Sequence, residues 1–322
     1  MSVATPADAA VHIPVMLAQV VDALQPALGH SGAVLVDATV GLGGHAAALL
    51  TACPASRLVG IDRDGQALEL AASRLAPFGE RVELVRQRFD ALPEVLDGLG
   101  IATADAILFD LGVSSLQIDQ ASRGFAYSQD GPVDMRMDDR LELDAATIVN
   151  TWPADDLTRI FRDFGEEPNA RRVAQAIVTA RQVMPIAQTS QLCDVVIDAM
   201  PAAIRFGDGG HPAKRVFQAL RITVNSELEA LQAALPLALE RLAVGGRVAV
   251  LSYHSLEDRL VKRAFASATQ DRTPRRLPVV PPELQPRFHI VGKPAQPAPE
   301  QEIARNRRAA SARLRVIERG QA

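Results

Sequence analysis

The sequence lacks the features that mark several large classes of protein. Its only two cysteines, Cys53 and Cys193, are far apart and match no metal-ligand spacing, so we expect reduced thiols, no disulfide and no metal site. No apolar run approaches the roughly 18 residues of a membrane span, and the N-terminus shows no secretion signal. We therefore expect a cytoplasmic protein with no membrane association. Aromatic residues make up only 4% of the chain, so aliphatic side chains must fill the core.

Charge is unevenly distributed along the 322 residues, a length that favours two domains. The net charge is −4, but residues 259–322 hold 14 basic and 5 acidic side chains, a net charge of +9, and the remainder carries −13. An acidic body with a basic tail indicates contact with a polyanion. Solvated surface charge explains the same composition equally well.

A glycine-bearing turn organises the first half of the chain. Residues 34–36 form an apolar run that is typical of a buried strand, and a helix is expected from His45. Between them, Gly41, Gly43 and Gly44 permit backbone angles and close approaches that other residues forbid. Such a turn holds a nucleotide-like cofactor at the carboxyl ends of parallel strands, where the free N–H groups of the helix point at the ligand.

Acidic residues at the expected strand ends identify the kind of cofactor. Asp62 lies about twenty residues beyond the glycine turn, where a carboxylate can accept ribose hydroxyls. Together with Asp37, Asp90 and Asp110 it would repel a pyrophosphate. The carboxylates suit S-adenosylmethionine, which has a ribose, positive charge and no phosphate. A nicotinamide cofactor is the disfavoured alternative.

The order of patterns predicts an α/β fold with an inserted helical domain. Apolar runs at 33–36, 58–61, 82–85, 106–110 and 247–252, separated by helical patterns, indicate a mostly parallel sheet covered on both faces. Residues 288–291 and 312–318 are expected to form a C-terminal hairpin. The span 118–210 contains helical patterns but no convincing strand. We therefore assign 1–117 and 211–322 to the sheet domain and 118–210 to the insertion, with Gly207–Gly210 in the return linker and a long helix over 214–242.

Motifs spread over nearly the whole chain resemble the ribosomal RNA small-subunit methyltransferase H family, also called MraW. The matching stretches are His12-Ile13-Pro14-Val15-Met16, Gly41-Leu42-Gly43-Gly44-His45, Asp110-Leu111-Gly112-Val113-Ser114-Ser115, Gly131-Pro132-Val133-Asp134-Met135-Arg136-Met137, Phe164-Gly165-Glu166-Glu167, His211-Pro212-Ala213, Phe217-Gln218-Ala219-Leu220-Arg221, Ser252-Tyr253-His254-Ser255-Leu256-Glu257-Asp258-Arg259 and Asn306-Arg307-Arg308-Ala309-Ala310-Ser311.

This resemblance implies a function, a cofactor and a fold. Members of the family methylate the exocyclic N4 of a cytidine in the decoding region of 16S rRNA, using S-adenosylmethionine. The implied fold is a Rossmann-like class I methyltransferase domain with an inserted helical domain for RNA recognition. Carried over residue by residue, the cofactor contacts would be Gly43, Gly44, His45, Asp62, Phe89, Asp110 and Gln117. The implied partner is 16S rRNA, within the small ribosomal subunit; a homo-oligomer is left open.

Candidates for the methyl-transfer chemistry are Asp110, Ser114 and His254, with Ser115 and Tyr253 beside them. Hydrogen-bond acceptors on the N4 amino group would localise its lone pair and later remove a proton. Capping by the serines and loop ordering by His254 are competing structural roles. DNA amino-methyltransferases place an Asp/Asn-Pro-Pro-aromatic motif here, but this chain has Asp110-Leu111-Gly112-Val113. A DNA amino-methyltransferase and a non-catalytic RNA-binding assembly factor remain the alternatives.

Overall fold

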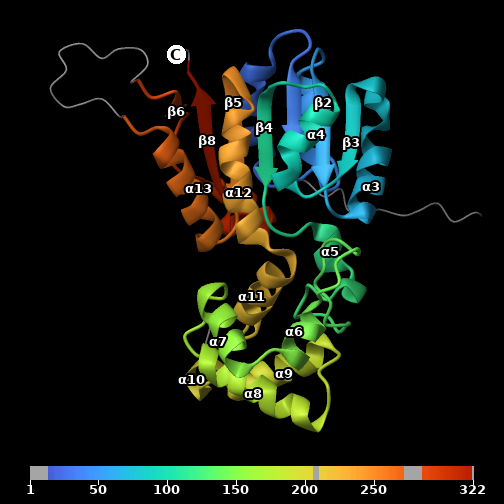
Figure 1. Cartoon of the computed structure of the whole chain (residues 1–322), viewed down its shortest axis with the longest axis vertical. Helices are drawn as coiled ribbons and strands as arrows, with labels where there is room; N and C mark the ends of the chain where they lie inside the picture. The colour runs from blue at the N-terminus through green and yellow to red at the C-terminus, as the bar shows by residue number, and fades with distance from the viewer. Residues whose placement is uncertain (1–13, 206–209, 272–284, 321–322) are drawn as a thin grey trace, which may run out of the picture. The chain divides into compact units, whose positions relative to one another are not determined.

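The computed structural model describes residues 14–205, 210–271 and 285–320, which form two compact units (Figure 1). The first unit combines Met1–Gly112 with Glu229–Ala322, and the second is Val113–Leu228. The expected insertion, 118–210, lies within the second unit. His12 and Ile13 of the first family motif and Gly207–Gly209 of the expected linker lie outside the described residues.

The first unit contains one eight-stranded sheet in the order β3-β2-β1-β4-β5-β8-β6, with β7 paired to β8. The strands are β1 (Val34–Asp37), β2 (Arg57–Asp62), β3 (Val82–Arg86), β4 (Ala104–Asp110), β5 (Leu242–Ser252), β6 (Phe288–Ile290), β7 (Gln296–Pro297) and β8 (Arg313–Arg319). β1 to β5 are parallel, whereas β8 runs antiparallel to β5, β6 and β7. This confirms the predicted mostly parallel sheet and the pairing of the two C-terminal strands.

Apolar side chains on both faces of the sheet are buried. Along β1, Leu35 packs into one core, while Val34 and Val36 pack into the other. Figure 1 shows helices on each side of the strands. The elements of this unit are α1 (Leu17–Leu24), η1 (Gln25–Leu28), α2 (Gly44–Ala52), α3 (Gly65–Leu75), η2 (Ala76–Arg81), η3 (Phe89–Ala91), α4 (Leu92–Gly98), α12 (Glu227–Glu240), α13 (Ser255–Ala268), α14 (Glu300–Arg305) and η6 (Arg307–Ser311). Continuous apolar strands therefore arise because both faces are covered.

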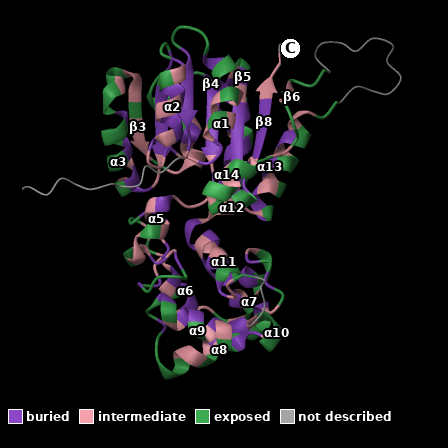
Figure 2. Ribbon diagram, turned by 180° about the vertical axis from the view of Figure 1, so that it is seen from behind, coloured by how far each residue is buried: buried purple, intermediate pink, exposed green. Residues whose placement is uncertain are grey.

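The second unit is built from helices around a separate apolar core. They are α5 (Ser115–Asp119), η4 (Ala121–Arg123), α6 (Ala145–Thr151), α7 (Ala154–Asp163), α8 (Ala170–Val183), α9 (Thr189–Ala199), α10 (Ala202–Arg205) and α11 (Lys214–Asn225). Phe161, Ile177 and Leu220 are buried members of this core, and Figure 2 shows buried segments along the helices of the unit. Within its described residues the only strand-like pairing is one bridge between Pro132 and Gln188.

Two local predictions were wrong. The expected helix over 214–242 divides into α11 and α12, because Ser226 adopts left-handed backbone angles (φ 48°). The preference for serine at an N-cap also predicts that Ser255, with Asp258 three residues on, caps the helix after β5, but the cap lies one residue earlier. His254 is the N-cap and Glu257 completes a capping box.

Among the described residues, no helix is long and apolar enough to cross a lipid bilayer.

Candidate cofactor and active site

The turn after β1 presents uncapped backbone N–H groups at the start of α2. Gly43, the N-cap residue, has φ 75° and ψ 17°, and no side chain caps the helix. The N–H of Gly41 is used differently, because it donates to Oδ2 of Asp62 at 2.8 Å. The turn is thus tied to the end of β2, while the first N–H groups of α2 can receive an anionic group of a ligand.

Gly44 is required by a contact within the chain. A Cβ atom at this position would lie 2.4 Å from Cγ of Pro14, closer than real Cβ contacts. The sequence interpretation attributed this glycine to close approach of a cofactor. The structure adds a different reason: Pro14, from the first family motif, packs directly against the backbone of the turn.

Asp62 lies at the carboxyl end of β2 with both of its oxygens in hydrogen bonds. Oδ2 accepts the N–H of Gly41, and Oδ1 accepts the N–H of Asp64 at 2.9 Å. Burial raises the pKa of Asp62 to about 6, against these hydrogen bonds, which lower it. The backbone N–H of Arg63 also donates to this carboxylate. A carboxylate has about four lone-pair sites, so it can still accept a ligand hydroxyl.

Asp110, at the carboxyl end of β4, is held by groups from three other elements. The hydroxyl of Tyr253, directly after β5, donates to Oδ1 at 2.6 Å. Nδ1 of His45 lies 3.4 Å from Oδ2. The backbone N–H of Asp110 donates to the hydroxyl of Thr39 at 2.6 Å. The carboxylate is therefore fixed in orientation, yet its side chain keeps 26% of its surface exposed.

His45 carries a hydrogen bond that determines its protonation. Its Nε2 lies 3.0 Å from the carbonyl oxygen of Val15, and a carbonyl can only accept, so Nε2 must hold a proton. Nδ1 then attracts the Asp110 carboxylate only when it is protonated too. Burial lowers the pKa of His45, but the hydrogen bond and charge of Asp110 and the charge of Asp37 raise it overall. The two residues form an ion pair when His45 is charged.

Asp37 is the most deeply buried carboxyl of the cluster, with 1% of its surface exposed. Its Oδ1 accepts the N–H of Thr39 at 3.3 Å. Its pKa is raised to about 7, mainly by burial and to a smaller extent by the charges of Asp110 and Asp62, while the charge of His45 and the Thr39 hydrogen bond lower it. Asp37 thus interacts with the site through its charge, mainly with His45, and has little exposed surface with which to touch a ligand.

Phe89 lies in the turn after β3, in the short helix η3. Its ring meets the ring of Phe109 edge to face, with centroids 5.7 Å apart. It is partly buried against the core that contains Phe109. The edge contact fixes the ring plane, and packing of Phe89 on an adenine remains a prediction.

Three further candidates have capping roles. Ser114 and Gln117 form a reciprocal capping box at the start of α5, with the Gln117 N–H 3.3 Å from Ser114 Oγ and the Ser114 N–H 3.1 Å from Gln117 Oε1. Both belong to the second unit. His254 caps α13 and contacts Glu257, with Nε2 3.2 Å from Oε1 at an angle too poor for a hydrogen bond.

Sequence reasoning gave no role to two residues that shape this cluster. Thr39 accepts the backbone N–H of Asp110, and its only sequence signal is its place two residues after a strand-ending aspartate. Glu257 is buried and accepts the N–H of Tyr253 at 2.7 Å. Its three-residue spacing from His254 fits a capping box, but histidine is not a usual N-cap residue.

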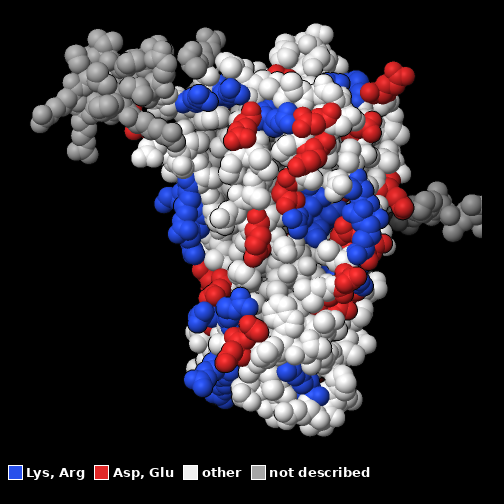
Figure 3. All heavy atoms as spheres, in the orientation of Figure 1, with Lys and Arg blue, Asp and Glu red and all other residues white. Residues whose placement is uncertain are grey.

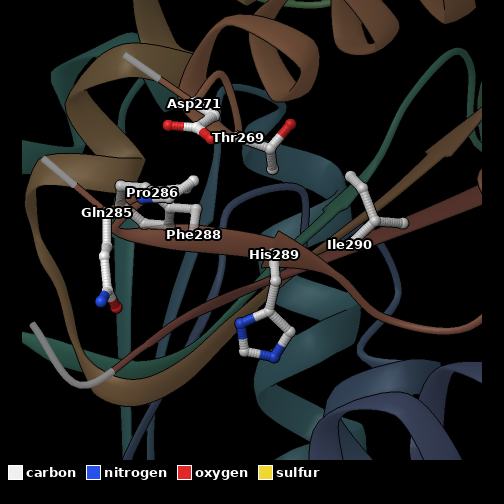
Figure 4. Close-up of a pocket in the computed structure, with 7 residues that line it drawn as sticks. All are labelled: Thr269, Asp271, Gln285, Pro286, Phe288, His289 and Ile290. Carbon is white, nitrogen blue, oxygen red and sulfur yellow. The ribbon is translucent and has the colours of Figure 1, made fainter. Parts of the chain in front are cut away.

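A hollow of about 550 Å³, shown in Figure 4, lies at the end of the sheet opposite to the acidic cluster. It is lined by Thr269, Asp271, Gln285, Pro286, Phe288, His289 and Ile290. Phe288 pairs with Arg319 beyond the amino-terminal ends of the parallel strands. The acidic cluster lies at their carboxyl ends, so this hollow is not part of it.

The strand order, the antiparallel β8 and the glycine turn define the class: the first unit has the Rossmann-like fold of class I methyltransferases. The chain belongs to the MraW methylase family, which it matches over residues 9–320. It is 58% identical to the ribosomal RNA small subunit methyltransferase H of Thermobifida fusca, over 96% of this chain and 93% of the relative. It is 53% identical to the protein of that name from Streptomyces avermitilis, with 96% of each chain covered.

A solved structure of a putative rRNA-methylase from Clostridium thermocellum matches 96% of this chain and 100% of its own. The TM-score is 0.44 and the sequence identity is 14%, and a likeness at that level carries no argument about function. Family membership rests on the sequence matches.

Proposed function

We propose that this protein transfers a methyl group from S-adenosylmethionine to the exocyclic N4 of a cytidine in the decoding region of 16S rRNA, in the cytoplasm. The observation that carries the proposal is the Asp110 carboxylate, oriented by Tyr253 and His45 at the carboxyl end of β4. It lies in a chain of the MraW methylase family whose relatives are named as small-subunit rRNA methyltransferases.

The residues at the carboxyl edge fit S-adenosylmethionine, which supplies an electrophilic methyl group on a sulfonium. Asp62 would accept the ribose hydroxyls. The first N–H groups of α2 would receive the carboxylate of the methionyl portion, and the charge of Asp110 would favour the cationic part. The charges of Asp62 and Asp110 also raise the pKa of the neighbouring Asp37, and such a cluster of carboxylates disfavours a pyrophosphate. This supports the proposed cofactor over a nicotinamide dinucleotide.

Asp110 is the group best suited to act on the acceptor amine. The N4 lone pair of cytosine is delocalised into the ring, so the nitrogen becomes nucleophilic when an acceptor draws on one of its N–H bonds. As the N–C bond forms, the S–C bond of the sulfonium would break to leave a neutral thioether, and the nitrogen would lose a proton to the Asp110 carboxylate. Tyr253 is a donor to Asp110, because burial and the neighbouring Asp110 charge raise the pKa of its hydroxyl well above the usual value. Because Tyr253 donates only to Oδ1, the carboxylate of Asp110 has lone pairs left with which it would accept a hydrogen bond from the N4 amino group.

The second unit is the proposed RNA-recognition unit, since RNA is read through unpaired bases, shape and phosphates. Arg171, Arg172 and Lys214 are exposed basic residues of this unit and are candidates for contact with phosphates. Arg136 is not available in the same way, because its guanidinium pairs with Asp134 and donates to the carbonyl of Leu141. On the face shown in Figure 3, basic and acidic side chains alternate instead of forming one continuous basic surface.

The test of the function uses labelled S-adenosylmethionine with three substrates that lack the modification: small ribosomal subunits, naked 16S rRNA and duplex DNA. We expect label on a cytidine N4 in subunits or in rRNA, and none in DNA. Label on DNA would favour a DNA amino-methyltransferase. Tight cofactor binding without label on any substrate would favour a non-catalytic assembly factor.

Replacing Tyr253 by phenylalanine removes one hydroxyl from the site and leaves the ring in place. We expect methyl transfer to fall about tenfold, because a hydrogen bond to a charged group is worth about 1.5–3 kcal/mol, while the dissociation constant of S-adenosylmethionine changes little. If Tyr253 acts through Asp110, the variants will not be additive. Tyr253→Phe should cost tenfold in the parent enzyme and almost nothing when Asp110 is already alanine; equal costs in both backgrounds would contradict this role.

A further inference from the structure

The contacts described above for Asp110 come from Tyr253, His45 and Thr39. The motif Asn306–Ser311 is not among them, but it lies at the same edge of the sheet. β8 begins at Arg313, which pairs with Ser252 at the carboxyl end of β5. Tyr253 follows Ser252 directly. The helices α14 and η6, which precede β8, therefore lie beside the end of the sheet where the parallel strands end, and Figure 2 shows α14 there.

This segment is anchored firmly to the first unit. Ala309 and Ala312 have no exposed surface and pack in the core that Tyr253 also contacts. Asn306 caps η6 by accepting the N–H of Arg308 at 3.1 Å. Oε1 of Glu302 accepts the N–H of Met16 at 2.6 Å, and the charge of Glu302 helps to raise the pKa of Tyr253, after the larger effects of burial and Asp110. The backbone that carries the arginines is thus held close to the site.

Arg305 and Arg307 are exposed on this anchored segment, and we call this pair the arginine rim. Within the part of the chain that the structure describes, no ion pair is found for Arg305 or Arg307. The two acids of α14 are Glu300, which is exposed, and Glu302, which is partly buried and accepts the N–H of Met16. Arg305 also lies in the last turn of α14, where a cation is favoured by the helix dipole, but that explanation does not extend to Arg307.

We propose that the arginine rim binds backbone phosphates of the RNA strand that carries the target nucleotide. The inference rests on the proposed function. An RNA strand that delivers a base to Asp110 must bring its phosphates close to Asp37, Asp62 and Asp110, whose charges repel them. Fixed arginines at the same edge offset this repulsion and hold the strand without reading its sequence. The methyltransferase unit therefore has a phosphate-binding surface of its own, in addition to the helical unit.

The test compares two double variants in binding an unmodified RNA fragment of the decoding region. Arg305→Gln with Arg307→Gln removes two rim charges. The matched control, Arg57→Gln with Arg287→Gln, removes two exposed charges near the opposite end of the sheet. We expect the rim variant to bind about tenfold more weakly at about 0.1 M salt, and the slope of log K against log salt to become shallower by about 1.4, or 0.7 per phosphate of a single strand. The control should match the parent protein.

Three outcomes would overturn the proposal. Unchanged affinity and salt slope in the rim variant would show that the rim does not touch RNA, and an equal loss in the control would show a general charge effect. Weakened binding to small subunits with unchanged binding to naked RNA would indicate a protein partner instead. The binding of S-adenosylmethionine should be the same in all variants. Failure of the parent protein to methylate N4 would count against the proposed function while leaving these binding results interpretable.

Discussion

Replacing Asp110 by alanine is expected to reduce methyl transfer at least a hundredfold, which corresponds to about 2.7 kcal/mol of transition-state stabilisation. The side chain combines what a direct role requires: it is partly exposed, its carboxylate is oriented by Tyr253 and His45, and it ends the strand next to the glycine turn. Loss of the carboxylate removes the acceptor for the amino group together with a charge beside the proposed cofactor site.

Asp110→Asn separates these contributions. Asparagine keeps the shape and can still accept the Tyr253 hydrogen bond, but it has no charge and cannot take up a proton. We expect it to be nearly as inactive as alanine in single-turnover methyl transfer. Calorimetric binding of S-adenosylmethionine and the thermal unfolding midpoint serve as controls for cofactor binding and for folding. Near-normal turnover by either variant would remove Asp110 from the mechanism.

The elements that the sequence predicts well are those with strong local signals. Runs such as residues 34–36 and 106–109 are continuously apolar and are each followed by an aspartate, and both lie in strands whose carboxyl ends meet at one edge. Parallel neighbours bring strand-ending residues together regardless of their separation in the chain. This rule is sufficient to gather Asp37, Asp62 and Asp110 before any side-chain geometry is known.

The contacts that orient these carboxylates have no comparable local signal. The hydroxyl of Tyr253 reaches Asp110 across 143 positions of sequence, and His45 reaches the carbonyl of Val15 across 30. Each depends on how separate elements pack. The sequence could therefore name Tyr253 and His45 as candidates, but it could not assign Asp110 as the partner of both, and it placed Ser114 and His254 on an equal footing.

The local errors have a physical origin as well. The apolar periodicity continues through Ser226, and no glycine or proline marks the left-handed residue that separates α11 from α12. The N-cap preference for serine selects Ser255, although the buried Glu257 can bond back to the N–H groups of Tyr253 and His254 only if the helix begins one residue earlier. Tertiary contacts overrule the local preference in both places.

Replacing Asp37 by asparagine is expected to stabilise the protein above pH 7, with a strong dependence on pH. Folding raises the pKa of this carboxyl from 3.8 to about 7. The folded state therefore binds a proton that the unfolded state releases, and the stability associated with Asp37 is full below about pH 4 and is lost as the pH rises through about 7. A shift of about three pKa units corresponds to about 4 kcal/mol, which is the upper limit of the effect at pH 8.

Asparagine removes the buried charge and keeps an oxygen that can accept the Thr39 N–H. At pH 8 the Asp37→Asn variant should unfold at a higher denaturant concentration than the parent protein. The difference should shrink steadily from pH 7 to pH 5, because the parent then protonates Asp37 in the folded state. Asp22→Asn, an exposed substitution on α1, is the matched control and should show no such trend.

If the Asp37→Asn variant is less stable than the parent at pH 8, or if its stability advantage does not change with pH, then folding does not raise the pKa of Asp37. In that case the ionised Asp37 carboxylate would not lower the stability of the folded protein, and the anionic cluster at the end of the sheet would not destabilise the fold through this residue.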